Sequence, residues 1–278
     1  MRKPGKVSKK TPSPQSFRRL VYEQYRRKGR VLPWRATRDP YAILVSELML
    51  QQTQVSRVLP KYEAFLKRLP TFEALAQAKF SDVLLLWQGL GYNRRAKALH
   101  DIAKEVTRTY QGKLPREKAL LRQLPGIGSY TASAILVFAH NIPAVMIETN
   151  IRTVYTHFFF PGKRNVADAE LLPLIERTMD KKNPRRWFSA LMDYGAYLKG
   201  SGIRINSRSS HYVRQSRFEG SRRQLRGALL RLILEKPQTI FALVKGSGRP
   251  AAPVREELVR LQKEKLVTKK ARIFVIGE

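Results

Sequence analysis

The sequence predicts a mainly helical protein that ends in a smaller module of three helices and a β-hairpin. From Tyr41 to about Thr156, short amphipathic segments follow one another between Gly and Pro residues, with apolar side chains at i, i+3 and i+4. Strand-like alternation is scarce in that region. Near the C-terminus the pattern changes, and residues 266–278 predict two short strands joined by a turn.

The composition excludes several classes of protein. The chain has 278 residues, a formal net charge of +33 and 43% hydrophobic residues, which is enough for a folded core. It contains no cysteine, which excludes disulfides, thiolate nucleophiles, zinc fingers and cysteine-held iron–sulfur clusters. No apolar run approaches the roughly 18 residues of a membrane span, and the basic N-terminus has no secretory signal pattern. We therefore expect a cytoplasmic, nucleoid-associated protein of bacterial type, whose positive charge favours a nucleic-acid partner.

The most specific motif is LPGIGSYTASAIL, residues 124–136. One helix is predicted to end near Leu121 and a second to start just after the glycines, which gives a helix-hairpin-helix over 119–136. Glycines permit positive φ and a close approach of phosphate, and the N–H groups that begin the second helix form an anion site. The hairpin is therefore predicted to hold a DNA backbone without reading bases, an ordinary turn being the alternative. Its contact residues are Gly126, Ile127, Gly128 and Ser129.

This hairpin resembles the helix-hairpin-helix of the endonuclease III superfamily of base-excision DNA glycosylases. Further motifs narrow the resemblance to the MutY adenine glycosylases, over about residues 17–200. These motifs are LPWR (32–35), SELMLQQTQV (46–55), WQGLGYNRRAKALH (87–100), ETNIRTV (148–154) and LMDYGAYLK (191–199).

The resemblance implies a two-lobed helix-hairpin-helix DNA glycosylase fold. It also implies a base-excision enzyme that flips a mispaired base out of double-stranded DNA and hydrolyses the N-glycosidic bond of that base, with adenine as the leading candidate. A glycosylase for mismatched thymine or uracil, or for another modified base, is an alternative, as is a non-catalytic DNA-binding regulator. The predicted regions are a disordered basic tail (1–16), a helical domain (17–40 with 151–202), a six-helix-barrel-like domain (41–150), an Arg-rich linker (203–220) and a winged-helix-like module (221–278). A generic helical cap is the alternative for that module.

Two carboxyl groups carry the predicted chemistry. Cleavage of an N-glycosidic bond passes through an oxocarbenium-like sugar, which needs an acid at the leaving base and an anion near C1′. Glu47 lies in an apolar helical segment, where a carboxyl group should hold its proton near neutral pH, and the resemblance makes it the general acid. Glu148 stands where the superfamily usually has Asp, which implies that it stabilises the cationic sugar. Its alternative role is to complement a helix N-terminus.

Two neighbours complete the predicted catalytic set. Asn150 is implied to orient the acid or its water. Tyr130 stands where bifunctional relatives carry the lysine that forms a Schiff base. Because tyrosine cannot form an imine, no lyase activity is expected.

The resemblance also implies where the extruded base and the gap it leaves are contacted. Asp193 is expected to recognise the adenine edge, with a structural salt bridge as the alternative. When the base leaves the duplex, side chains of the protein must fill the gap. Leu90 is expected to be one of them, and the alternative is that Leu90 belongs to the protein core. The base-pocket residues are Trp34, Arg35, Leu50 and Asp193, and the intercalating residues are Gln52, Thr53, Leu90 and Tyr92.

The sequence departs from the family at two places. The four positions of the usual cluster cysteines hold Lys199, Asn206, Ser209 and Gln215, so no iron–sulfur cluster and no other cofactor is expected. The winged-helix-like module replaces the NUDIX-like domain that detects 8-oxoguanine. The expected protein is a monomer, with space for a monovalent cation at the hairpin carbonyls near Leu124 and Ile127. Additional contacts to the DNA backbone are expected from Arg204, Arg208 and Arg214.

Overall fold

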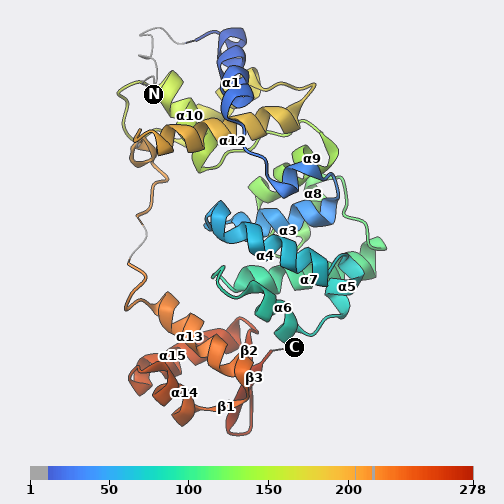
Figure 1. Ribbon diagram of the computed structural model, residues 1–278, viewed down its shortest axis with the longest axis vertical. Coiled ribbons are helices and arrows are strands. Elements are labelled where there is room, and N and C mark those ends of the chain that lie inside the picture. Colours follow the sequence, from blue (N-terminus) through green and yellow to red (C-terminus); the bar gives the residue numbers. More distant parts are fainter. Residues whose placement is uncertain (1–11, 204, 215–216, 278) are drawn as a thin grey trace. The chain divides into compact units, whose positions relative to one another are not determined.

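The computed structural model describes residues 12–203, 205–214 and 217–277, and in this part of the chain the predicted helical character is confirmed (Figure 1). None of the described helices is long and apolar enough to cross a bilayer. The helices are α1 Pro14–Lys28, α2 Pro33–Ala36, α3 Pro40–Leu50, α4 Val55–Arg68, α5 Phe72–Gln77, α6 Phe80–Trp87, α7 Arg94–Tyr110, α8 Lys118–Gln123, α9 Ser129–His140, α10 Thr149–Phe159, α11 Asp168–Thr178, α12 Pro184–Gly200, α13 Arg222–Glu235, α14 Ile240–Ser247 and α15 Ala251–Lys263. The strands are β1 Gln238–Thr239, β2 Val267–Lys270 and β3 Ile273–Ile276, and Asn206–Arg208 form a 3-10 turn.

The chain folds into two compact units. The described residues of 1–43, 116–122 and 127–214 form unit 1, and those of 44–115, 123–126 and 215–278 form unit 2. Each unit therefore combines segments that lie far apart in the sequence.

The core of unit 1 is aromatic. Phe17 of α1 is fully buried, and its ring meets those of Tyr155, Phe159 and Trp187 edge to face at 5.2, 5.0 and 5.8 Å between centroids. Helices α10 and α12 lie side by side (Figure 1). Gly195 permits this contact, because a Cβ at that position would lie 2.4 Å from the backbone oxygen of Asn150.

The C-terminal module of unit 2 consists of α13–α15 and a three-stranded antiparallel sheet in the order β1-β3-β2. The predicted hairpin is confirmed, with Val267 opposite Ile276. The third strand, β1, has two residues and pairs Gln238 with Phe274. So short a strand leaves no alternation in the sequence from which it could be predicted.

One helix begins earlier than the prediction places it. Helix α1 begins at Pro14, inside the region assigned to the tail, because Ser13 caps it by accepting a hydrogen bond from the N–H of Ser16 at 3.2 Å. Helix α3 ends at Leu50, and Gln52 in the turn that follows takes a positive φ of 54°.

The described residues 205–214 of the Arg-rich segment belong to unit 1. The N–H of Val166 donates to the carbonyl of Arg208 at 2.9 Å, and Val166 forms a β-bridge with Ser209. Ile205 is buried. This segment is therefore more than a linker. Arg204 and Gln215 lie outside the described residues.

Candidate active site and nucleic-acid interface

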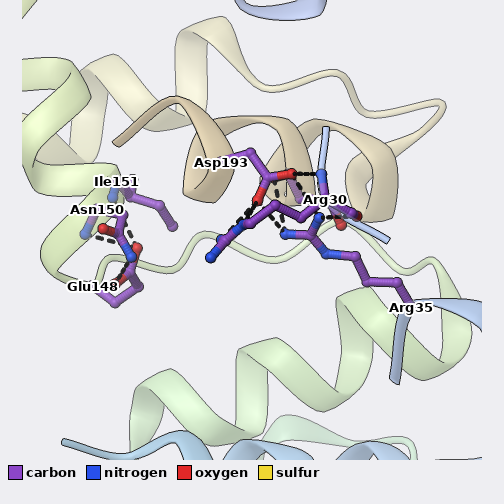
Figure 2. A network of polar contacts seen from close by, with 7 residues as sticks. Arg30, Arg35, Glu148, Asn150, Ile151 and Asp193 are labelled. Carbon is purple, nitrogen blue, oxygen red and sulfur yellow. Dashed lines mark hydrogen bonds and ion pairs between the residues drawn. The ribbon is translucent and has the colours of Figure 1, made fainter. Parts of the chain in front are cut away.

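Glu148 is the N-cap of α10 in unit 1 (Figure 2). Its Oε1 accepts hydrogen bonds from the N–H groups of Asn150 and Ile151 at 2.8 and 2.9 Å, and its Oε2 accepts one from Asn150 Nδ2 at 3.2 Å. Burial raises the pKa of Glu148, whereas the backbone N–H donors and the positive charges of Arg152 and Arg30 act to lower it. The half-buried carboxyl group thus loses part of its solvation, while the helix N-terminus supports its ionised form. Glu148 and Asn150 are in hydrogen-bond contact, and the alternative role of Glu148 at a helix N-terminus is confirmed.

Asp193 of α12 lies in a second polar cluster of unit 1 (Figure 2). Arg35 Nη1 and Nη2 donate to its two oxygens at 2.7 and 2.8 Å, a bidentate pair. The backbone N–H and the Nε of Arg30 add bonds of 2.8 and 2.7 Å. Burial alone would raise the pKa of Asp193, but the hydrogen bonds and charge of Arg35, with those of Arg30, hold it below its usual range.

The geometry of Asp193 in this structure is that of a structural ion pair. Its carboxylate is 5% exposed and both oxygens are occupied by guanidinium and backbone donors, so the salt-bridge alternative describes it. Arg30, which sequence reasoning missed, contributes positive charge to Asp193 and to Glu148. Of the other base-pocket residues, Trp34 is buried in unit 1, and Leu50 ends α3 in unit 2.

Glu47 lies in unit 2, on α3, and is 7% exposed. Its apolar neighbours Leu44 and Leu48 are buried as well, so the prediction of a carboxyl group buried beside apolar residues is confirmed. Such a group loses the solvation that favours its charged form.

Arg95, at the start of α7, holds the loops that carry the predicted intercalating residues. Its guanidinium donates to the carbonyls of Leu48 and Gln51, each at 2.6 Å, and to Thr53 Oγ1 at 3.0 Å. It also stacks over the ring of Tyr92, with 5.3 Å to the centroid. Burial lowers the pKa of Arg95 to about 10, a value at which it stays charged near neutral pH.

The sequence pattern around Arg95 indicates its role. The residue stands four positions before Leu99, in line with Ile102 and Val106 on the buried face of α7. An arginine on an apolar face needs buried acceptors.

The intercalating candidates differ in exposure. Gln52 and Tyr92 are exposed, and both have positive φ, which marks sharp turns at the loop tips. Leu90 is 2% exposed, so its core alternative describes this structure. Thr53 is half-buried and receives the bond from Arg95.

The helix-hairpin-helix is confirmed, with α8 ending at Gln123 and α9 beginning at Ser129. Gly126 has φ 75°, and a Cβ there would lie 2.8 Å from the Cβ of Ala98. Gly128 differs from the prediction, because its φ of −83° is accessible to any residue. Nothing lies within 4 Å of a Cβ built on Gly128, so the entrance to the α9 N-terminus is open. Ile127 is buried, which leaves its backbone rather than its side chain for contacts.

The remaining candidates lie in unit 1. Tyr130 is half-buried and packs against that core. Arg208 is half-buried and Arg214 is exposed. At the positions of the family's cluster ligands, the ammonium of Lys199, the amide of Asn206 and the hydroxyl of Ser209 supply no thiolate, so these residues do not fit an iron–sulfur cluster.

Comparisons with known proteins identify the family of this chain. The family profile of the HhH-GPD superfamily of base excision DNA repair proteins matches residues 45–175. The adenine DNA glycosylase of Mycolicibacterium smegmatis is 38% identical over 218 residues, covering 72% of this chain and 74% of that protein. The adenine DNA glycosylase of Buchnera aphidicola subsp. Baizongia pistaciae is 34% identical over 187 residues, 66% of this chain, which spans 52% of that relative's length.

Solved structures match the fold. A thermostable thymine-DNA glycosylase aligns with a TM-score of 0.59 and 27% identity over 66% of this chain and 86% of that one. Endonuclease III in a non-covalent DNA complex aligns with a TM-score of 0.56 over 67% and 87%, and at 17% identity this likeness shows the fold alone. The chain therefore belongs to the HhH-GPD superfamily of base excision DNA repair proteins, among the relatives of the adenine DNA glycosylases.

Proposed function

We propose that the protein is a monofunctional DNA glycosylase that removes adenine mispaired in double-stranded DNA. The observation that carries this proposal is the retention of two carboxyl groups in a chain of this family: Glu47, which is buried, and Glu148, which is half-buried and has a pKa raised by burial. Burying a carboxyl group costs free energy, and a protein that only binds DNA gains nothing from it. A non-catalytic regulator is therefore the weaker hypothesis.

The two carboxyl groups have different surroundings, which suit different roles. Glu47 has buried neighbours and donates a proton to the departing purine, then helps to activate water. Glu148 accepts hydrogen bonds from two N–H groups at the start of α10, and it stabilises the positive charge that develops on the sugar. Asn150 is hydrogen-bonded to Glu148 and orients it.

The product of this reaction is an intact abasic site. Tyr130 has no amine with which to attack the opened sugar, so strand cleavage requires a second agent. Trp34, Arg35 and Leu50 remain the candidates for contact with the extruded base. No cofactor is needed for these steps, which use only proton transfer and charge stabilisation.

The DNA is held by the hairpin and by basic side chains. The N–H groups at the start of α9 bind a backbone phosphate, and the exposed tips at Gln52 and Tyr92 enter the gap left by the base. The winged-helix-like module adds affinity for the duplex through Lys269 and Arg272 of its hairpin, both exposed. The protein acts as a monomer.

Removal of mismatched thymine is the second candidate, because a thymine-DNA glycosylase is among the structures it resembles, at 27% identity. The adenine DNA glycosylases are closer in sequence, at 34–45% over 131 to 218 residues, and this favours adenine.

A panel of labelled duplexes tests the proposal. Each contains one of A·8-oxoguanine, A·G, G·T or G·U, is incubated with the protein, and is divided into samples with and without hot alkali. We expect cleavage of the adenine strand only after alkali. Cleavage of the G·T duplex instead would establish the second candidate, cleavage without alkali would contradict the monofunctional assignment, and intact strands throughout would favour a DNA-binding regulator.

A further inference from the structure

A cavity of about 670 Å³ lies within unit 2, between the loop tips after α3 and α6 and the first turns of α13. Its volume is in the range of roughly 300–1,000 Å³ that sites for small organic ligands have. Gln52 and Tyr92 line one side, and Phe218 and Arg222 line the other. The C-terminal module and Phe218 just before it thus supply one wall, so the cavity depends on the part of the chain that differs from the usual family architecture.

The cavity is strongly basic. Five arginines line it, against the single carboxylate of Glu264. That carboxylate is already ion-paired with Arg226 and lies 3.8 Å from Arg94. Arg57 is exposed, and Arg222 is 66% exposed, with its Nε 3.5 Å from the buried carboxylate of Glu257. An anionic group with two or more oxygens suits this wall.

The cavity also presents aromatic rings to solvent. Phe218 is 60% exposed and Tyr92 is 37% exposed, although large apolar side chains are normally covered. Aromatic rings beside arginines bind single-stranded nucleotides, whose bases stack on the rings while their phosphates pair with the guanidinium groups. The lining therefore fits a nucleotide better than it fits an apolar ligand or a peptide.

We infer that this cavity binds the unpaired nucleotide of the DNA strand opposite the extruded base, with the base against Phe218 and its phosphate at Arg222. This inference rests on the proposed function, because that function places Gln52 and Tyr92 in the gap. Extruding one base leaves its former partner without a pair. That partner is the nucleotide nearest to the intruding tips, and the cavity opens beside both.

Binding to duplexes without an excisable base tests this inference. Labelled duplexes carry a tetrahydrofuran abasic analogue opposite either a guanine or a second abasic analogue, and dissociation constants are measured by fluorescence anisotropy. The wild-type protein should bind the guanine duplex about tenfold more tightly than the double-abasic duplex, since stacking of one base on an aromatic ring has a value of this order. Phe218→Ala should reduce that ratio to about twofold or less. Phe241→Ala removes an exposed ring outside the cavity and should leave the ratio unchanged.

The arginine is tested through salt dependence. Arg222→Gln should weaken binding of both duplexes and reduce the slope of log K against log salt by about 0.9, the value for one phosphate contact. Arg231→Gln, on the exposed surface of the same helix outside the cavity, is the matched control and should reduce the slope less. Equal wild-type affinity for the two duplexes, a ratio unchanged by Phe218→Ala, or equal slope changes in the two arginine variants would overturn the inference. Because no base is excised, these measurements hold even if the panel above shows no glycosylase activity.

Discussion

Arg95 Nη2 donates a hydrogen bond to Thr53 Oγ1 at 3.0 Å, which joins the start of α7 to the turn after α3. The same guanidinium donates to the carbonyls of Leu48 and Met49 at 2.6 and 2.8 Å, at the end of the helix that carries Glu47. The cation thereby satisfies carbonyl groups that a helix C-terminus leaves without partners. One buried side chain therefore fixes both the proposed acid's helix and the loop tips.

Arg95→Lys should destabilise the protein by about 2 kcal/mol or more. An ammonium has three donors in place of five and cannot reach both loops from one position, so buried carbonyls lose their partners. The free energy of unfolding in urea measures the loss. Arg94→Lys is the matched control on the same helix, because the Arg94 side chain is 75% exposed, and its effect should stay within about 0.5 kcal/mol. Equal effects of the two substitutions would refute a special role for Arg95.

Asp193→Asn should destabilise the protein by about 3 kcal/mol at neutral pH, since it leaves Arg35 partly buried without its counter-charge. The pKa of Asp193 is lowered by its arginine partners. Its contribution is therefore present above the unfolded-state pKa and is lost as pH falls through the folded-state value. Urea unfolding should show a constant penalty between pH 5 and pH 8, by this linkage, and a smaller one under more acidic conditions. Asp101→Asn removes a helix-surface pair with Lys97 and should cost less than about 1 kcal/mol. A penalty for Asp193→Asn no larger than that of this control would show that the network is not stabilising.

Glu148→Gln should change stability in a pH-dependent way. Because burial raises the folded-state pKa of Glu148, the favourable contribution of its protonated form is complete below the unfolded-state pKa and is lost as pH rises through the folded-state value. Glutamine stays neutral and keeps an acceptor for the N–H groups of Asn150 and Ile151. The melting temperature of the variant minus that of the wild type should therefore be more positive at about pH 8 than at about pH 5. A difference independent of pH would contradict the raised pKa.

His100 should make the protein sensitive to mild acid. Its ring stacks on Phe80 at 5.5 Å, its Nε2 lies 3.0 Å from the carbonyl of Ala78, and burial lowers its pKa to about 4. The unfolded chain takes up a proton near pH 6.5, so stability should fall between that pH and about 4, by up to roughly 3 kcal/mol. His100→Phe should flatten this part of the stability profile, as measured by urea unfolding at several pH values. An unchanged slope would contradict the assignment.

The sequence was sufficient for the helical class, the hairpin and the burial of Glu47, because each depends on local pattern. Periodicity predicts which face of a helix is apolar, and the glycines mark a turn. The sequence pattern could not show that Asp193 is hydrogen-bonded to Arg30 and Arg35. These partners lie 163 and 158 positions away from Asp193 and meet it only through tertiary packing. Leu90 was ambiguous for the same reason, because a leucine beside glycines suits either a loop tip or a core.

The two-carboxyl mechanism is the central claim, and single-turnover excision by Glu47→Gln tests it most directly. The amide keeps the shape of the side chain but has no proton to give to the base. We expect the rate of adenine release to fall by at least about 100-fold, the usual size of a general-acid effect, while the dissociation constant for DNA changes by less than about threefold. Glu63→Gln, on the exposed surface of α4, should keep the wild-type rate. Release of adenine by Glu47→Gln at the wild-type rate would contradict the account.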